Sequence, residues 1–244
     1  MRLRLTVAYD GAKFSGWQSQ AHGKAVQDAL EQAFQLLCGN PVTVHGAGRT
    51  DAGVHAIGQS AHVDVPDGRL ELGNWLGAVN AHLPQGVRVM RVQKAAPDFH
   101  ARFSARGKVY RYTVWNGPVL PPLLIDRAWH VPGKLDLNLL RSACMSFIGR
   151  HDFAAFCARG SKAPEPTTRT ITFIRVTRKG PEIAITFHGE GFLYKMVRML
   201  TASAVRCAAG RIPLEELRHR LENAGPRINH VAPAGGLCLM RVTY

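Results

Sequence analysis

A glycine-rich segment from Gly46 to His55 combines a carboxylate, a cation and small residues. It reads Gly-Ala-Gly-Arg-Thr-Asp-Ala-Gly-Val-His. Its glycines permit backbone angles that other residues avoid, so the chain can approach a bound molecule closely. Asp51 lies two residues from Arg49, and a nearby positive charge favours the ionised carboxylate. The segment therefore indicates Asp51 as a nucleophile for covalent catalysis.

An ordinary turn is the competing interpretation of the same segment. Asp residues commonly accept hydrogen bonds from the nearby backbone in Asx turns, and Thr-Asp-Ala-Gly is typical of such a turn. Taken alone, the loop favours this interpretation, and Arg49 is then one more surface charge. His55, at the end of the segment, is expected to be a structural hydrogen-bonding residue.

The elements around this segment follow a regular order. Residues 2–9 alternate polar and apolar side chains as a strand does, and apolar residues then recur at helical spacing from 26 to 37. The pattern further predicts strands at 42–45 and 60–65, a helix at 70–83 and a strand at 87–92. This βαββαβ order is the ferredoxin-like arrangement, an antiparallel sheet with helices on one face.

The second half of the chain repeats that order with little repeat of sequence. Strands are predicted at 108–115, 170–177, 182–188 and 237–242, and helices at 137–147, 192–209 and 214–221. We therefore expect an α+β fold of two ferredoxin-like halves, residues 1–105 and 106–244, whose antiparallel sheets join.

The charge of the chain favours an anionic partner. It has 31 Lys and Arg against 17 Asp and Glu, a formal charge of +14, which favours a polyanion such as nucleic acid. A solvated basic surface without a nucleic-acid partner is the other interpretation.

The cysteines and the hydropathy pattern indicate the compartment. The five cysteines form no C-x-x-C pair, which indicates reduced thiols. With no secretion signal or membrane span in the pattern, we expect a cytoplasmic protein.

Several segments in order along the chain resemble one family. The run from Gly48 to His55 resembles the catalytic motif of the TruA-type tRNA pseudouridine synthases. Further segments resemble this family across nearly the whole chain: residues 9–11, 14–18, 26–27, 30–31, 101–105, 110–112, 151–153 and 192–198.

The resemblance implies the pseudouridine synthase fold and an isomerase. Asp51 attacks the target nucleotide, the uracil detaches and turns, and its C5 rejoins the sugar. Whether the carboxylate adds to C6 of the base or to C1′ of the sugar stays open. The resemblance implies no metal and no organic cofactor. It also implies tRNA as substrate, modified at positions 38, 39 and 40 of the anticodon stem-loop, and a homodimer.

The same resemblance assigns roles to three more residues. Tyr110 matches an active-site tyrosine whose ring faces the extruded uracil. The alternative interpretation is that Tyr110 is a strand residue of the hydrophobic core. Arg49 matches an arginine that holds the base or its vacated place. Arg198 falls among apolar helix residues, where a guanidinium needs an anionic partner, and Asp51 is the expected one. Met199 stands where the family commonly has Asn; the helix is expected to survive this change.

Two other functions compete with isomerisation of tRNA, and a third has weaker support. An RRM-like RNA-binding protein without catalysis would use Tyr110 and Tyr112 to stack bases on an open sheet. The isomerase chemistry could also serve another structured RNA. The H-x-E at His188 fits a zinc deaminase, but no P-C-x-x-C follows it. Any enzyme acting on a stacked base must extrude the nucleotide into a pocket.

Overall fold

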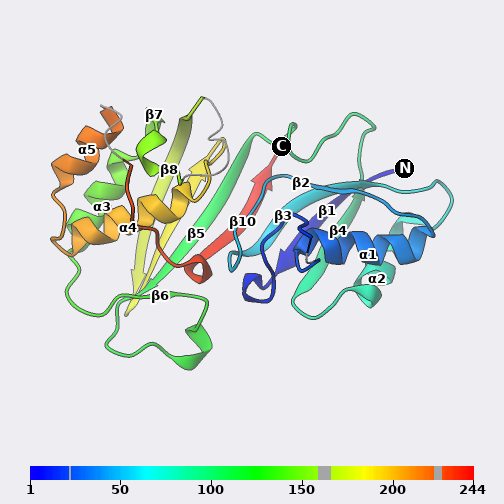
Figure 1. Cartoon of the computed structure of the whole chain (residues 1–244), viewed down its shortest axis with the longest axis horizontal. Coiled ribbons are helices and arrows are strands. Elements are labelled where there is room, and N and C mark those ends of the chain that lie inside the picture. The colour runs from blue at the N-terminus through cyan, green and yellow to red at the C-terminus, as the bar shows by residue number, and fades with distance from the viewer. Residues whose placement is uncertain (22, 159–165, 223–226) are drawn as a thin grey trace. The chain divides into compact units, whose positions relative to one another are not determined.

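The computed structural model describes residues 1–21, 23–158, 166–222 and 227–244. Two compact units divide the chain: Met1–Arg106 with Cys238–Tyr244, and Gly107–Leu237. Each unit combines a sheet with helices, as Figure 1 shows. The predicted α+β fold class is thereby confirmed.

The first unit follows the predicted βαββαβ order. Its elements are β1 (Arg2–Tyr9), α1 (Val26–Cys38), β2 (Val44–Gly46), β3 (His55–Asp64), α2 (Trp75–His82) and β4 (Val87–Lys94). Strand β1 lies between β3 and β4 and pairs with both in antiparallel register. Strand β2 pairs antiparallel with β3. The observed β3 begins at His55, five residues before the predicted start, which shortens the loop around Asp51.

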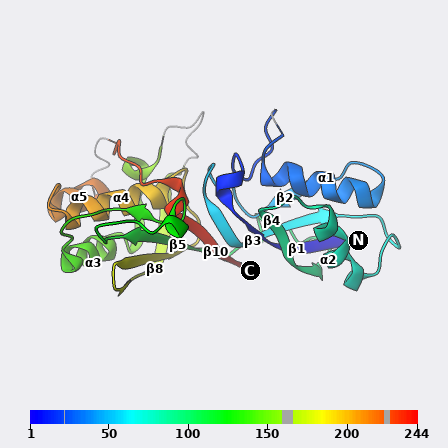
Figure 2. The same ribbon diagram turned by 90° about the horizontal axis from the view of Figure 1, so that it is seen from below.

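One face of this sheet carries the core of the unit. Leu3, Leu5 and Val7 alternate along β1 and are fully buried. Burial of each such side chain contributes about 1.5–3 kcal/mol to the free energy of unfolding, relative to leaving it exposed. Helix α1, which lies alongside the sheet in Figure 2, contacts α2 through the stacked rings of Phe34 and Trp75, 5.7 Å apart. The core therefore holds β1 and both helices in fixed positions.

The last strand of the chain differs from the expectation. Strand β10 (Leu237–Thr243) runs parallel to β3, with Cys238 opposite His55. It passes so close to Gly58 that a Cβ there would lie 2.3 Å from the carbonyl oxygen of Met240. Contacts thus place residues 238–244 in the first unit rather than in the second half of the chain. Strand periodicity cannot reveal this, because it carries no information about the partner strand.

The second unit contains two short strands that the sequence did not predict. Its elements are β5 (Gly107–Trp115), β6 (Trp129–His130), α3 (Leu137–Ser146), β7 (Gly149–Asp152), β8 (Thr168–Lys179), β9 (Glu182–Gly189), α4 (Met196–Ala208) and α5 (Leu214–Glu222). The antiparallel order is β5-β9-β8-β7, and β6 pairs parallel with β5. Strands β6 and β7 have two and four residues, too short for a periodic pattern to identify.

Helix α4 begins four residues later than predicted. Lys195 precedes it with a φ of 58°, and a left-handed residue of this kind interrupts a helix. Residues 193–196 therefore form a turn that leads into α4, with the N–H of Met196 donating to the carbonyl of Leu193 at 3.1 Å. Within the helix, the buried hydroxyls of Thr201 and Ser203 donate to carbonyls one turn back, at 2.8 Å each, which satisfies them inside the core.

The cysteines and the helices bear on two further expectations. All five cysteines are free, and four of them are buried, which agrees with the predicted reduced thiols. Burial raises the pKa of the Cys144 thiol to about 12. Across the described ranges, no helix combines the length and the apolar character that crossing a membrane requires.

Candidate active site

The loop that carries Asp51 joins β2 to β3 and is held at its start by the sheet. Gly46 lies opposite Ala61, and the next residue, Ala47, still donates its N–H to the carbonyl of Ser60 at 2.8 Å. The side chain of Gln59, fully buried in β3, donates to the carbonyl of Gly48 at 2.9 Å. The chain thus enters the loop along a fixed path.

Thr50, the residue between Arg49 and Asp51, is the buried anchor of this loop. Its hydroxyl shares a 2.8 Å hydrogen bond with the Tyr9 hydroxyl, and both residues are buried. Its carbonyl accepts the Trp17 N–H at 3.1 Å. Burial raises the pKa of Tyr9, so its hydroxyl stays protonated near neutral pH. Backbone and side-chain bonds therefore fix the position from which Asp51 extends.

Two glycines let the turn after β1 lie directly against the loop. Gly16 has a φ of 96°, and a Cβ there would come within 2.6 Å of the Thr50 carbonyl oxygen. A Cβ on Gly11 would lie 2.2 Å from the Val54 carbonyl oxygen. The N–H of Gly11 donates to Nδ1 of His55 at 3.0 Å, which confirms the structural role predicted for His55. Larger residues at either glycine would push the two segments apart.

Asp51 itself begins a tight turn. Its backbone carbonyl accepts the N–H of Val54 at 3.1 Å, and Gly53 has a φ of 81°, as the third position of a type II turn requires. The predicted turn is therefore present, and a backbone carbonyl closes it. Asp51 is half-buried, whereas Arg49 is exposed and donates from Nε to the Gln18 side chain at 3.1 Å. Both charged residues thus lie on one fixed loop of the first unit.

Tyr110 belongs to the second unit, on β5. It is only 7% exposed, and its ring meets that of Phe192 edge-on at 5.3 Å. Tyr112, two residues along the same strand, is fully buried. Both rings therefore face the core side of their sheet, which argues against an RRM-like use of these tyrosines on an open surface.

Arg198 lies in the first turn of α4, also in the second unit. Its Nε donates to the carbonyl of Ala232 at 2.8 Å, and Ala232 donates back to the Arg198 carbonyl at 3.3 Å. The hydroxyl of Tyr112 donates to the carbonyl of Pro233 at 2.7 Å. These bonds fasten the segment around Pro233 beside the start of α4 and orient the arginine.

Met199 follows Arg198 and is buried in the core of the second unit. Its carbonyl accepts the hydroxyl of Ser203 at 2.8 Å, and α4 runs unbroken from Met196 to Ala208. The expectation that the helix survives a methionine at this position is confirmed.

Comparison with known proteins identifies the family. A family model described as tRNA pseudouridine synthase matches residues 5–104 and 143–244. This chain belongs to that family. Asp51, Arg49 and Arg198 lie inside the matched ranges, and Tyr110 lies between them. The synthase is an isomerase that converts uridine to pseudouridine, and the resemblance predicted from the sequence motifs is confirmed.

Individual relatives agree with this assignment. Proteins named tRNA pseudouridine synthase A from Akkermansia muciniphila and Solidesulfovibrio magneticus are 47% and 46% identical to the synthase, each over 100% of this chain and over 95% and 91% of their own lengths. A chain from a solved structure titled as a Cbf5-Nop10-Gar1 complex aligns with 97% of this chain and 48% of its own length, at 13% identity and a TM-score of 0.38. The family assignment rests on the sequence matches.

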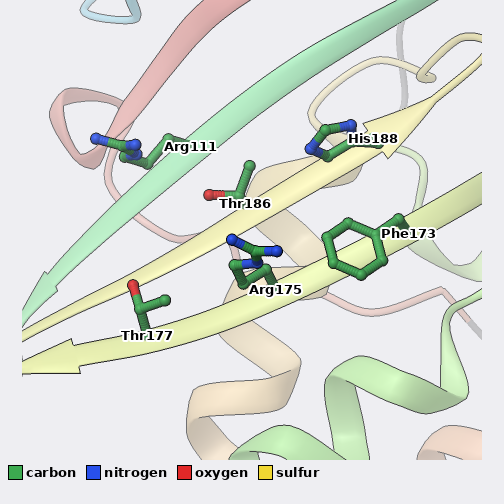
Figure 3. Close-up of a pocket in the computed structure, with 6 residues that line it drawn as sticks. All are labelled: Arg111, Phe173, Arg175, Thr177, Thr186 and His188. Atoms are coloured by element: carbon green, nitrogen blue, oxygen red, sulfur yellow. The ribbon is translucent and has the colours of Figure 1, made fainter.

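The second unit has a hollow on the face of its sheet opposite Tyr110 (Figure 3). Six side chains surround about 350 Å³ on the sheet formed by β5, β9 and β8: Arg111, Phe173, Arg175, Thr177, Thr186 and His188. Because neighbouring strand residues point to opposite faces, Arg111 and Tyr110 lie on different sides of the sheet. His188 lies here, and the residues the structure describes contain no group of three or more potential ligands placed to hold a metal ion.

Sequence reasoning missed the residues that fix the loop. Tyr9 and Trp17 belong to segments that resemble the family, but their bonds to Thr50 span 41 and 33 positions of the chain, which no local pattern reports. Gln59 offered a signal, because an amide inside a strand with buried neighbours requires a hydrogen-bond partner. That signal identifies a buried polar contact but not the partner.

Proposed function

We propose that the protein converts uridine to pseudouridine in tRNA, at positions 38, 39 and 40 of the anticodon stem-loop, with Asp51 as the nucleophile. The observation that carries this proposal is the fixed loop: Thr50 is buried against Tyr9 while the neighbouring Asp51 is half-buried. A nucleophile gains most when its geometry is set before the substrate binds. The names of the relatives support tRNA as the substrate.

The reaction balances without an external reagent. A carboxylate oxygen of Asp51 bonds to the nucleotide, the bond between N1 of the uracil and C1′ of the sugar breaks, and the detached uracil turns. A new bond forms between C5 and C1′ as the bond to Asp51 breaks. The proton on C5 then leaves to solvent and N1 takes up a proton, so the product is an isomer of the substrate.

The other predicted site residues have supporting roles in this proposal. Arg49, exposed beside the nucleophile, holds the extruded base or fills the space it leaves. The ring of Tyr110, positioned by Phe192, faces the uracil, and Arg198 balances the charge of Asp51.

The substrate is held largely through its phosphates. The formal charge of +14 favours a polyanion over a small neutral ligand. Each phosphate contact releases counterions from the RNA, so binding should weaken steeply as salt increases.

Tritium release from tRNA that carries 5-tritiated uridine tests the chemistry. We expect release by the wild type and a loss of at least about 1,000-fold in Asp51→Asn, because removal of a nucleophile leaves only the binding contribution. Asp98→Asn, which removes the same charge from an exposed position, is the matched control and should keep the activity. Both variants should still bind tRNA.

The same assay tests the position. Three tRNAs that each retain a single uridine, at position 38, 39 or 40, should all release tritium, whereas a tRNA with uridine only elsewhere should not. Tight binding of tRNA without release by the wild type would exclude the proposal. Full release by Asp51→Asn would exclude Asp51 as the nucleophile.

We further propose that the protein is a cytoplasmic homodimer. Free thiols fit a reducing compartment. Val119, Leu123 and Ile125, between β5 and β6, are exposed apolar residues, and exposed apolar patches commonly mark contacts between proteins. Sedimentation should give the mass of two chains for the wild type and of one for Leu123→Asp; a monomeric wild type would contradict the homodimer.

A further inference from the structure

A second fixed turn of the first unit presents an aromatic ring to solvent. Phe103 is 77% exposed and lies at a turn formed by residues 100–104, after β4. The N–H of Ser104 donates to the carbonyl of His100 at 2.9 Å, and the N–H of His100 donates back to the Ser104 hydroxyl at 3.0 Å. A phenylalanine this exposed gains little from folding, so its position calls for another explanation.

Three histidine rings form a continuous chain of ring contacts with Phe103. The ring centroid of His100 lies 4.3 Å from that of Phe103, His62 lies 4.6 Å from His100, and His45 stacks on His62 at 4.8 Å. His62 is buried, and His45 is exposed at the other end of the group. The four rings therefore form one continuous aromatic cluster with Phe103 at its solvent end.

The same histidines fix the backbone that carries Phe103. Nδ1 of His62 accepts the N–H of Ala101 at 3.1 Å. Nδ1 of His100 accepts the N–H groups of Arg102 and Phe103 at 3.1 and 3.3 Å. The ring is thus held in place before any partner arrives, which lowers the entropy cost of binding.

The charges around the ring indicate what it binds. Residues 100–106 include Arg102 and Arg106, both exposed, and no acidic residue. The guanidinium of Arg102 lies 5.7 Å from the centre of the Phe103 ring. An exposed aromatic ring beside arginines is how proteins combine base stacking with contacts to phosphates in single-stranded nucleic acid.

We propose that Phe103 is a stacking platform for an unpaired nucleobase of the RNA substrate, with Arg102 placed to contact an adjacent phosphate. The proposal rests on the RNA substrate proposed above and extends it to a second contact site. His62 of the cluster is seven residues along β3 from His55, where the Asp51 loop ends, about 23 Å at about 3.3 Å per residue. Thr50, next to Asp51, bonds Tyr9, which pairs with Ala56 at that end of β3. The base that stacks here is therefore not the one that reacts.

Substitution of Phe103 tests this platform. For Phe103→Ala we expect tRNA to bind about 5- to 100-fold more weakly, the usual effect of losing one base stack, with KM raised to match. The single-turnover rate at saturating tRNA should stay at the wild-type value, because Asp51 is remote. Met90→Ala removes an exposed apolar side chain from β4 of the same unit and should bind as the wild type does.

A tryptophan at the same position provides a direct readout. Phe103→Trp keeps a stacking surface, so it should bind tRNA normally, and the fluorescence of this tryptophan should be quenched when tRNA is added. The wild type, which has only the four native tryptophans, is titrated with tRNA in parallel, and its change in fluorescence is subtracted.

Two results would overturn the proposal. The first is wild-type binding by Phe103→Ala, with or without quenching of the tryptophan. The second is a change in the sedimentation of Phe103→Ala without RNA, which would make the ring a contact between protein chains. Neither result depends on catalysis: failure of the proposed function would appear as absent tritium release, while the platform would still be read from binding.

Discussion

Two turns of the first unit, residues 47–54 and 100–104, each present a side chain on a fixed backbone, but they are fixed by different chemistry. Hydroxyl, amide and backbone groups hold the first turn, chiefly through Tyr9, Thr50 and Gln59. Imidazole nitrogens that must be unprotonated hold the second, through His62 and His100. Bonds of the first kind do not change near neutral pH, whereas bonds of the second kind are lost when a histidine takes up a proton.

This difference matches what each turn is proposed to do. A nucleophile loses rate when it moves by about 1 Å, and, apart from the bond between Gly11 and His55, its loop is held by groups that keep one protonation state near neutral pH. A stacking ring tolerates small displacements, because any base can lie against it in many orientations. The comparison predicts that substitutions beneath Asp51 change the rate of the chemical step, whereas substitutions around Phe103 change binding.

Among changes to the groups that hold the two turns, removal of the bond between Tyr9 and Thr50 should have the largest effect. Tyr9→Phe deletes only the hydroxyl, which bonds the side chains of Thr50 and Gln59, and Thr50→Val deletes the Thr50 hydroxyl while keeping the shape of the side chain. Each should lower the single-turnover rate about 10- to 100-fold with little change in tRNA binding, because the fixed position of the nucleophile is lost.

The two changes should not be additive if they break the same bond. The double variant should then be about as slow as Tyr9→Phe alone, which a double-mutant cycle measures directly. Tyr244→Phe is the control, because it removes a hydroxyl that donates to the Ala101 carbonyl at 2.8 Å in the same unit. Additive losses, or an equal loss in Tyr244→Phe, would reject the anchor and leave a general effect on stability.

The sequence predicted Asp51 and Arg49 on one loop, because a motif is a local feature. It also predicted the strand and helix order of the first unit, since alternating and helical apolar patterns give clear signals. The bond between Tyr9 and Thr50 could not be predicted, because it joins positions 41 residues apart. A turn was expected from Thr-Asp-Ala-Gly and is present, closed by the backbone carbonyl of Asp51; the side-chain bond of an Asx turn stays a prediction.

Three other features lie beyond local patterns. The partner of β10 is a matter of register between distant strands, which periodicity does not encode. The late start of α4 depends on the left-handed backbone of Lys195, a conformation that lysine rarely adopts. The histidine cluster brings together His45, His62 and His100 from three segments, and isolated histidines in a sequence give no sign of this.

The next largest effect is on the free energy of unfolding, which should depend on pH because His62 holds the second turn. Burial first, and then the nearby charges of His45, His100 and Arg2, lowers the pKa of His62 from 6.5 to about 4, against a small opposing effect of Asp64. Between these two values the unfolded chain binds more protons than the folded chain. The contribution of His62 is therefore complete above about pH 6.5 and is lost as the pH falls towards 4.

Thermal unfolding at pH 7 and pH 5 measures this contribution. The wild type should lose several degrees of Tm more than His62→Asn between the two values, about the effect of 1 kcal/mol in a protein of this size. Asparagine is the matched variant, because its side-chain oxygen can accept the Ala101 N–H and does not titrate. Equal losses in both proteins would show that protonation of His62 does not release the turn.

The smallest effect separates charge from stacking at the second turn. Arg102→Gln should weaken tRNA binding only a few-fold at low salt, but it should reduce the slope of log Kd against log salt by about 1, because one phosphate contact is lost. Arg102→Lys keeps the charge and should keep the slope. Phe103→Ala should weaken binding with the slope unchanged. If Arg102→Gln left the slope at its wild-type value, Arg102 would contact no phosphate, and the two turns would differ only in how their backbones are held.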